Sequence, residues 1–222
     1  MPVYYGVNGK ARLVTRGYYG INGKSELIIG SGEIPSSSGC IQHKYLYSTY
    51  NYSDSLSDSL DDGIHTYRQI IYKFVFKKEP YTMSWERYLF ALGSLHPVLK
   101  YNSTTKKSYL EITKGSNSWT SPDLSLNTEY TINLCYGDCY FNNTKIFNNT
   151  QIITTDSSVQ LIPYQGQIEK ESIYFIGMQI YDQLNKKILK KYIPCIQNGS
   201  TAGVWDTIGK KFLTGDYLNC SN

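Results

Sequence analysis

The stretch IYFIGMQIYDQLNKKILKKYIPCIQNGSTAGVWDTIGKKFLTG, residues Ile173 to Gly215, decides the fold class. From Ile176 to Ile180 aliphatic residues occupy every second position, which is the period of a strand with one buried face. A polar turn at 182–186 follows, and a second apolar run leads into Pro194, which is expected to end ladder pairing there. The stretch therefore predicts a long antiparallel hairpin.

The rest of the chain has the same two-residue period. In 67–78 the side chains of Ile70, Tyr72, Phe74 and Phe76 share one face, and 130–136 alternates as regularly. The 22 tyrosines favour strands over helices. A net charge of +4, spread along the chain, excludes nucleic acid as the expected partner. With 222 residues, one all-β antiparallel sandwich with a small appendage is expected.

An internal repeat forms the appendage. YYGVNGK at 4–10 recurs as YYGINGK at 18–24, and Asn-Gly between short apolar runs is the strongest local signal for a hairpin with a type I′ turn. Two hairpins bury too little to fold alone, so their exposed tyrosines require a partner surface. The residues predicted to bind a partner are Tyr4, Tyr5, Asn8, Gly9, Tyr18, Tyr19, Asn22 and Gly23.

Composition divides the chain into three parts. Residues 1–30 contain the hairpins, 31–39 form a linker rich in Ser and Gly, and 40–222 form the larger domain. Within that domain, 51–63 (NYSDSLSDSLDDG) is predicted to be a polar, solvated loop. Its aspartates suggest calcium, but the spacing of an EF-hand is absent, so no cofactor or metal is expected.

Two motifs resemble those of known families. The hairpin, followed by Pro194-Cys195, by Gly203-Val204-Trp205-Asp206 and by Lys211-Phe212, resembles the C-terminal end of the laminin-G-like, concanavalin A-like jelly rolls of phage and prophage structural proteins. The N-terminal unit resembles the YxGVNGKAR-type repeats of phage tail and minor structural proteins of Gram-positive bacteria. Trp205 departs from the first pattern, in which tyrosine is commoner.

The resemblance implies a virion structural protein. Its N-terminal hairpins would attach to other virion proteins, and its jelly roll would be displayed in several copies, or as a homo-oligomer, for host-surface adhesion or decoration. The implied location is the virion, with synthesis in the host cytoplasm. Residues 1–14 lack the apolar core of a signal peptide, and no apolar run is long enough to span a membrane, so neither a secretory route nor a membrane partner is expected.

The alternative is a carbohydrate-binding module that acts as a receptor-binding protein on host glycans. Trp119, in the polar run SNSWTSPD, is expected to be exposed and to stack on a sugar ring, and Asp61 and Asp62 are candidate hydrogen-bond acceptors. Exposed aromatic side chains beside polar groups on the outer face of the jelly roll would favour this function over a purely structural one.

Catalysis is not expected. A glycoside hydrolase needs two carboxylates facing one cleft, and the sequence contains no such pair on one strand. The three histidines are isolated, and neither HExxH nor Gly-x-Ser-x-Gly occurs. The five cysteines have neither CxxC spacing nor nearby histidines, so they are predicted to be free thiols rather than zinc ligands.

Overall fold

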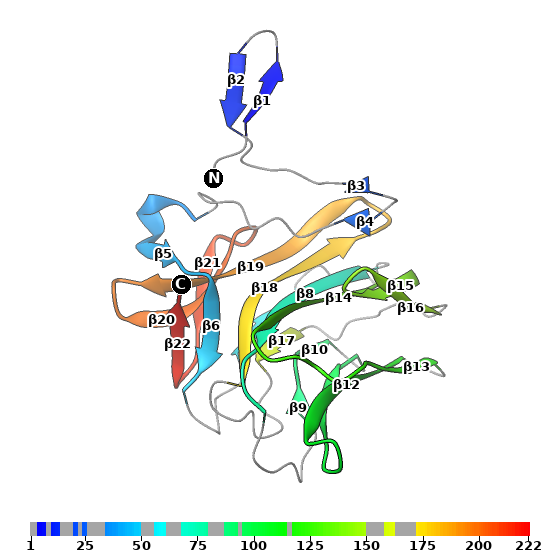
Figure 1. The fold of residues 1–222 in the computed structure, drawn as a ribbon. Coiled ribbons are helices and arrows are strands. Elements are labelled where there is room, and N and C mark those ends of the chain that lie inside the picture. The colour runs from blue at the N-terminus through cyan, green and yellow to red at the C-terminus, as the bar shows by residue number, and fades with distance from the viewer. Residues whose placement is uncertain are drawn as a thin grey trace.

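The computed structural model describes residues 4–7, 10–13, 20–21, 24–25, 34–49, 56–60, 68–79, 87–92, 95–114, 117–149, 158–162 and 172–222. Within these ranges the regular structure is antiparallel strands and one 3-10 turn, η1 (Ser36–Ser38). The predicted all-β antiparallel sandwich, preceded by two hairpins, is confirmed (Figure 1).

The first layer is a large sheet. Its strands are β5 (Cys40–Gln42), β6 (Tyr45–Ser48), β8 (Arg68–Phe76), β14 (Thr128–Leu134), β15 (Gly137–Phe141), β16 (Thr144–Asn149), β18 (Ile173–Asp182), β19 (Lys187–Gln197), β20 (Thr201–Asp206), β21 (Lys211–Thr214) and β22 (Leu218–Ser221). They run in the order β16-β15-β14-β8-β18-β19-β20-β21, with β6 pairing β18 and β22, and β5 pairing β19.

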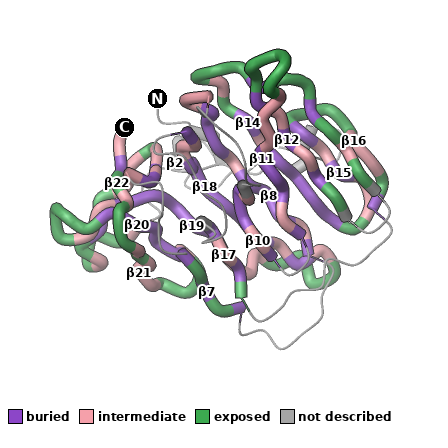
Figure 2. Tube along the Cα trace, turned by 90° about the horizontal axis from the view of Figure 1, so that it is seen from below, coloured by how far each residue is buried: buried purple, intermediate pink, exposed green. Residues whose placement is uncertain are grey.

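Two smaller sheets form the second layer. One contains β13 (Asn117–Thr120), β12 (Lys107–Lys114), β11 (Val98–Asn102) and β9 (Arg87–Tyr88) in that order. The other contains β10 (Ala91–Leu92), β17 (Ser158–Ile162) and β7 (Leu56–Ser59). Buried positions run along β8, β14 and β18, whereas exposed positions gather at the turns (Figure 2).

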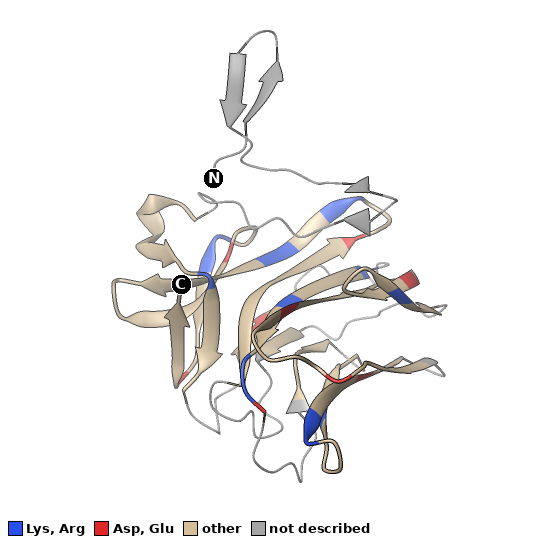
Figure 3. Ribbon diagram, viewed as in Figure 1, with Lys and Arg blue, Asp and Glu red and all other residues tan. Residues whose placement is uncertain are grey.

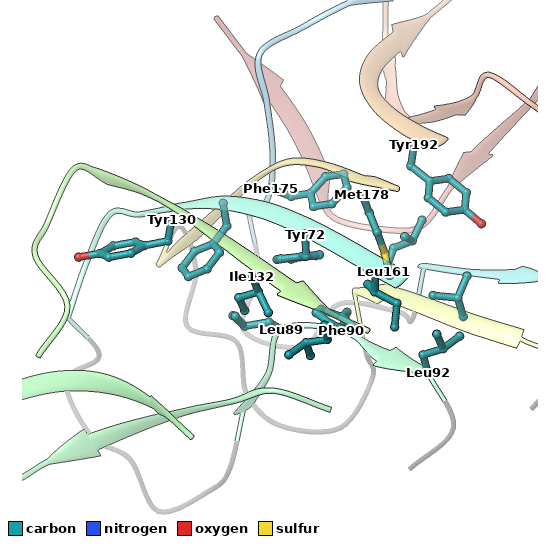
Figure 4. Close-up of a cluster of buried hydrophobic side chains, with 14 of the residues drawn as sticks. Tyr72, Leu89, Phe90, Leu92, Tyr130, Ile132, Leu161, Phe175, Met178 and Tyr192 are labelled. Carbon is teal, nitrogen blue, oxygen red and sulfur yellow. The ribbon is translucent and has the colours of Figure 1, made fainter. Parts of the chain in front are cut away.

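The core lies between the layers. The predicted inner face of β8 is confirmed, because Ile70, Tyr72, Phe74 and Phe76 are each 1% exposed or less and belong to one apolar cluster. From the other layer, Phe90 places its ring centroid 4.9 Å from that of Tyr72 (Figure 4). Burial of such side chains is the main favourable term in folding.

The hairpin of β18 and β19 forms as predicted, with two corrections. A bulge at Ile176 shifts the register between Phe175 and Gly177, so Phe175, rather than Ile176, shares the core with Met178. Pro194 also does not end the ladder, because it pairs with Val204 inside β19. Pro194 lies where the neighbour of β19 changes from β18 to β5, so its missing N–H leaves no broken ladder bond.

The N-terminal strands form two separate hairpins. β1 (Tyr4–Val7) pairs with β2 (Lys10–Leu13), and β3 (Gly20–Ile21) pairs with β4 (Lys24–Ser25). Among the described strands, neither hairpin pairs with the sandwich. The second half of the predicted linker contacts the sandwich, since the Asn198 N–H donates to the Gly39 carbonyl at 2.9 Å.

Candidate functional site

The candidate site is a group of aromatic rings on the outer face of the large sheet, which we call the tyrosine cluster: Tyr45, Tyr47 and Tyr174. On β6 and β18, Leu46 and Phe175 are directly paired and point into the core. Because side chains alternate along a strand, the flanking tyrosines point outward. The pairing therefore brings Tyr47 and Tyr174 together as cross-strand neighbours.

The rings of the tyrosine cluster are in direct contact. Tyr47 and Tyr174 stack with centroids 4.4 Å apart and planes 6° from parallel, and Tyr45 meets Tyr174 edge-on at 5.7 Å. All three are half-buried. Val75 pairs with Tyr174 on this outer face yet is only 4% exposed. The cluster is thus an ordered aromatic platform with an apolar floor.

Two lysines border the platform. The ammonium of Lys77 lies 5.2 Å from the ring centroid of Tyr174 and 5.7 Å from that of Tyr45, and it also donates to the Asn127 side-chain carbonyl at 3.3 Å. The ammonium of Lys44 lies 4.9 Å from the Tyr45 ring centroid. These distances are in the range of cation–π attraction.

Lys44 is a positive charge at the edge of the cluster. A side-chain hydrogen bond with Tyr45 raises the pKa of Lys44, so the ammonium stays charged at neutral pH. Positive and negative residues are interspersed along the strands of the ribbon in Figure 3. The cluster therefore combines aromatic faces with hydrogen-bond donors.

A pocket between the two layers adjoins the cluster, and Tyr47 belongs to both. Apolar side chains of both layers line it, including Leu46, Leu99 and Phe175. Ser172 also lines it. The Ser172 hydroxyl is fully buried, with no hydrogen-bond partner among the described residues. Such an unpaired buried group is uncommon in native structures and requires an explanation.

Tyr72, a core residue with a phenol hydroxyl, also lines this pocket. Burial raises the pKa of Tyr72, so its hydroxyl keeps its proton and can donate a hydrogen bond. Every residue found to line the pocket is uncharged.

Of the residues predicted to bind sugar, only Trp119 is among those that the structure describes. Trp119 is half-buried in β13, where its ring lies 5.1 Å from that of Phe141 and packs against the core. Trp119 was expected to be exposed, and the structure shows that it is only partly exposed. Asp61 and Asp62 lie outside the described residues.

The predicted partner-binding residues of the hairpins are only partly described. Tyr4 and Tyr5 are in β1, and the structure gives their backbone pairing. The remaining six, Asn8, Gly9, Tyr18, Tyr19, Asn22 and Gly23, lie outside the described residues.

The loop prediction for 51–63 is wrong at 56–59. Leu56–Ser59 is strand β7, and the Asp58 side chain is 1% exposed. Asp58 accepts hydrogen bonds from Lys190 at 3.0 Å, from the Tyr192 hydroxyl at 2.8 Å and from Lys211. Lys190 also donates to Asp206 at 3.1 Å. An inward-facing aspartate whose charge is offset by two lysines and a tyrosine hydroxyl explains why so polar a segment is a strand.

Metal ligands, membrane-spanning helices and the state of the cysteines can be assessed within the described residues. No group of three or more His, Cys, Asp or Glu in these ranges is placed to hold a metal ion. In the same ranges no helix has the length and apolarity needed to cross a membrane. The five cysteines are buried and unpaired, as predicted.

Comparison with known proteins gives one structural similarity. No family model matches the chain, and no curated protein matches it. The chain is similar to a solved structure from Bacteroides ovatus ATCC 8483 that is described as a "putative carbohydrate binding protein", with a TM-score of 0.48 and 12% identity. The match covers 82% of this chain and 61% of that one, so this chain spans less than two thirds of its length.

Proposed function

We propose that the domain binds carbohydrate, with the tyrosine cluster as its platform. The observation behind this proposal is the stack of Tyr47 on Tyr174 on the outer face, bordered by Lys44 and Lys77. A tyrosine has a flat apolar face and a polar tip. The C–H face of a sugar ring can pack on such a platform, while its hydroxyls accept hydrogen bonds from the lysines. The sequence argument required exposed aromatics beside polar groups on a glycan-binding face, and the half-buried rings of the cluster meet that requirement in part.

The test is substitution within the platform. Tyr174→Leu keeps an apolar cover over Val75 but removes the ring, so the fold is expected to persist. On a glycan array followed by calorimetry, we expect the variant to bind the best ligand about tenfold more weakly, which is the usual cost of truncating a central aromatic contact.

The matched control is Tyr136→Ala. Tyr136 is 44% exposed and follows β14 just after Leu134. Tyr174 is aligned, across Val75 of β8, with Glu129 near the other end of β14. Removal of the Tyr136 ring should therefore leave affinity unchanged. Equal binding by wild type and Tyr174→Leu, with both proteins folded, would refute the tyrosine cluster as the platform.

A second proposal concerns attachment. We propose that the N-terminal hairpins hold the domain on a larger assembly, such as a virion, in several copies. The supporting observation is that β1–β2 and β3–β4 are two-stranded sheets that pair with no other described strand. An isolated hairpin is marginal in water and gains stability on a partner surface. Multiple copies would also strengthen weak sugar binding by avidity.

Deletion of residues 1–31 tests the attachment proposal. We expect the truncated chain to keep the melting temperature and the monomeric glycan affinity of the full chain, because these strands pair outside the sandwich. It should no longer co-sediment with particles assembled in the producing cell. Normal incorporation of the truncated chain would show that the hairpins are not the attachment element.

A further inference from the structure

We infer that Cys135 and Cys139 are a site of reversible oxidation, at which a peroxide converts the two thiols into a disulfide bond across the turn between β14 and β15. Cys135 directly follows Leu134, the last residue of β14, and Cys139 lies in β15. Both thiols are free in the structure. This modification site is independent of the proposed carbohydrate binding.

The contacts of the two cysteines are reciprocal. The Cys139 sulfur accepts from the backbone N–H of Cys135 at 3.5 Å and donates to its carbonyl oxygen at 3.4 Å, so it lies against the residue that carries the other thiol. The Cys135 sulfur donates to the carbonyl oxygen of Asp138 at 3.0 Å, in the peptide group that precedes Cys139. The two thiols also hydrogen-bond to each other. Side-chain rotation can therefore join the sulfurs without separating β14 from β15.

The turn above the thiols is open to solvent. Tyr136 is 44% exposed, and Gly137 has a φ of +103° with no described atom within 4 Å of where a Cβ would lie. Cys135 is 7% exposed and Cys139 is 1% exposed, so a small oxidant must pass only the turn to reach them. The hydrogen bond with Cys135 lowers the pKa of the Cys139 thiol, which favours the nucleophilic thiolate.

The reaction takes place in two steps. The Cys139 sulfur attacks one oxygen of hydrogen peroxide, the O–O bond breaks, and the departing hydroxide takes up the thiol proton and leaves as water. The Cys135 sulfur then attacks the sulfur of the resulting sulfenic acid, so the S–S bond forms, the S–O bond breaks and a second water leaves. The two thiols together lose two electrons and two protons, and the peroxide is reduced to water.

The test treats the folded, reduced full chain with hydrogen peroxide, alkylates the remaining thiols and digests with trypsin. The tryptic peptide 115–145 contains Cys135, Cys139 and no other cysteine. We expect this peptide to lose two hydrogens and to gain no alkyl group, and dithiothreitol should restore both alkylation sites. The melting temperature of the oxidised protein should increase by about 2–5 °C, because the bond restricts the unfolded chain.

The other three thiols are the internal comparison. Cys40, Cys195 and Cys220 are buried as well, and we expect them to be alkylated in the same sample. The peroxide concentration is set to one that oxidises the thiols of the urea-unfolded chain. Two alkyl groups on peptide 115–145 from the folded protein, or a disulfide from either of its cysteines to one of these three, would overturn the inference.

Cys135→Ala separates disulfide formation from simple thiol oxidation. Without the second sulfur, Cys139 should stop at a sulfenic acid that dimedone traps, and the melting temperature should not increase on oxidation. Trapping of the sulfenic acid to the same extent in wild type would show that Cys135 does not react with it. The mass measurement on wild type decides the question alone where the variant does not fold.

Discussion

Asp58→Asn is expected to lower the free energy of unfolding by about 3–5 kcal/mol, the usual cost of breaking a buried ion pair by removing one partner. Asp58 accepts from Lys190, Lys211 and Tyr192, and its carboxylate is 1% exposed. The amide cannot balance the ammonium of Lys190, which is itself only 14% exposed. Since small domains are stable by about 5–15 kcal/mol, urea denaturation should show the loss clearly.

The same contact predicts a pH dependence. Burial alone would raise the pKa of Asp58, but hydrogen bonds from Lys211, Lys190 and Tyr192 outweigh it and hold the pKa below its ordinary value. A carboxyl group whose pKa is lowered by folding stabilises the folded state at pH values above its pKa in the unfolded chain. This stabilisation is lost as the pH decreases through the pKa of the same group in the folded state. The stability difference between wild type and Asp58→Asn should therefore shrink below about pH 4.

Asp138→Asn is the matched control. Asp138 is also paired with a lysine, Lys145 at 2.7 Å, but both side chains are substantially exposed. Surface pairs contribute little because water and salt screen them. An effect of Asp58→Asn no larger than that of Asp138→Asn, or a difference between wild type and Asp58→Asn that grows in acid, would contradict the account of the buried network.

Gly203→Ala is expected to cost about 3 kcal/mol of unfolding free energy, at the upper end of what overpacking usually costs. A Cβ at Gly203 would lie 2.2 Å from the Leu213 backbone carbonyl oxygen and 2.8 Å from the Phe212 ring. The nearest atom belongs to the backbone of β21, so relief requires β20 and β21 to separate. Thermal unfolding of Gly203→Ala measures this cost.

Thr201→Ala serves as the comparison, because Thr201 lies in the same strand and is exposed. Its melting temperature should stay close to that of wild type. An unchanged melting temperature for Gly203→Ala would mean that β20 and β21 pack less tightly than the structure shows.

The sequence predicts where strands occur better than it predicts which strands pair with each other. The alternation in β8 gives its core face correctly, and Asn-Gly at 8–9 and 22–23 gives the two hairpins, because both signals are local. The bulge at Ile176 and the pairing of Pro194 were not predicted, since each depends on which strand lies alongside. A polar strand such as β7 has no apolar alternation strong enough to reveal it, because Asp58 occupies an inward position.

The tyrosine cluster could not be predicted for the same reason. The alternation of Tyr45, Leu46 and Tyr47 places both tyrosines on one face, but nothing local shows that β6 pairs with β18. The cluster requires that long-range pairing to bring Tyr174 alongside. Trp119 was the sequence candidate because its flanking residues are polar, yet the cross-strand partner of Trp119 is Ile112, a core residue.

The most direct test of carbohydrate binding at the tyrosine cluster is chemical-shift mapping with the glycan that binds best on the array. The account predicts that the aromatic signals of Tyr45, Tyr47 and Tyr174 shift most during the titration, together with the side chain of Lys77. Shifts centred on Trp119 or on Tyr136 instead, or no saturable shift with any glycan, would contradict it.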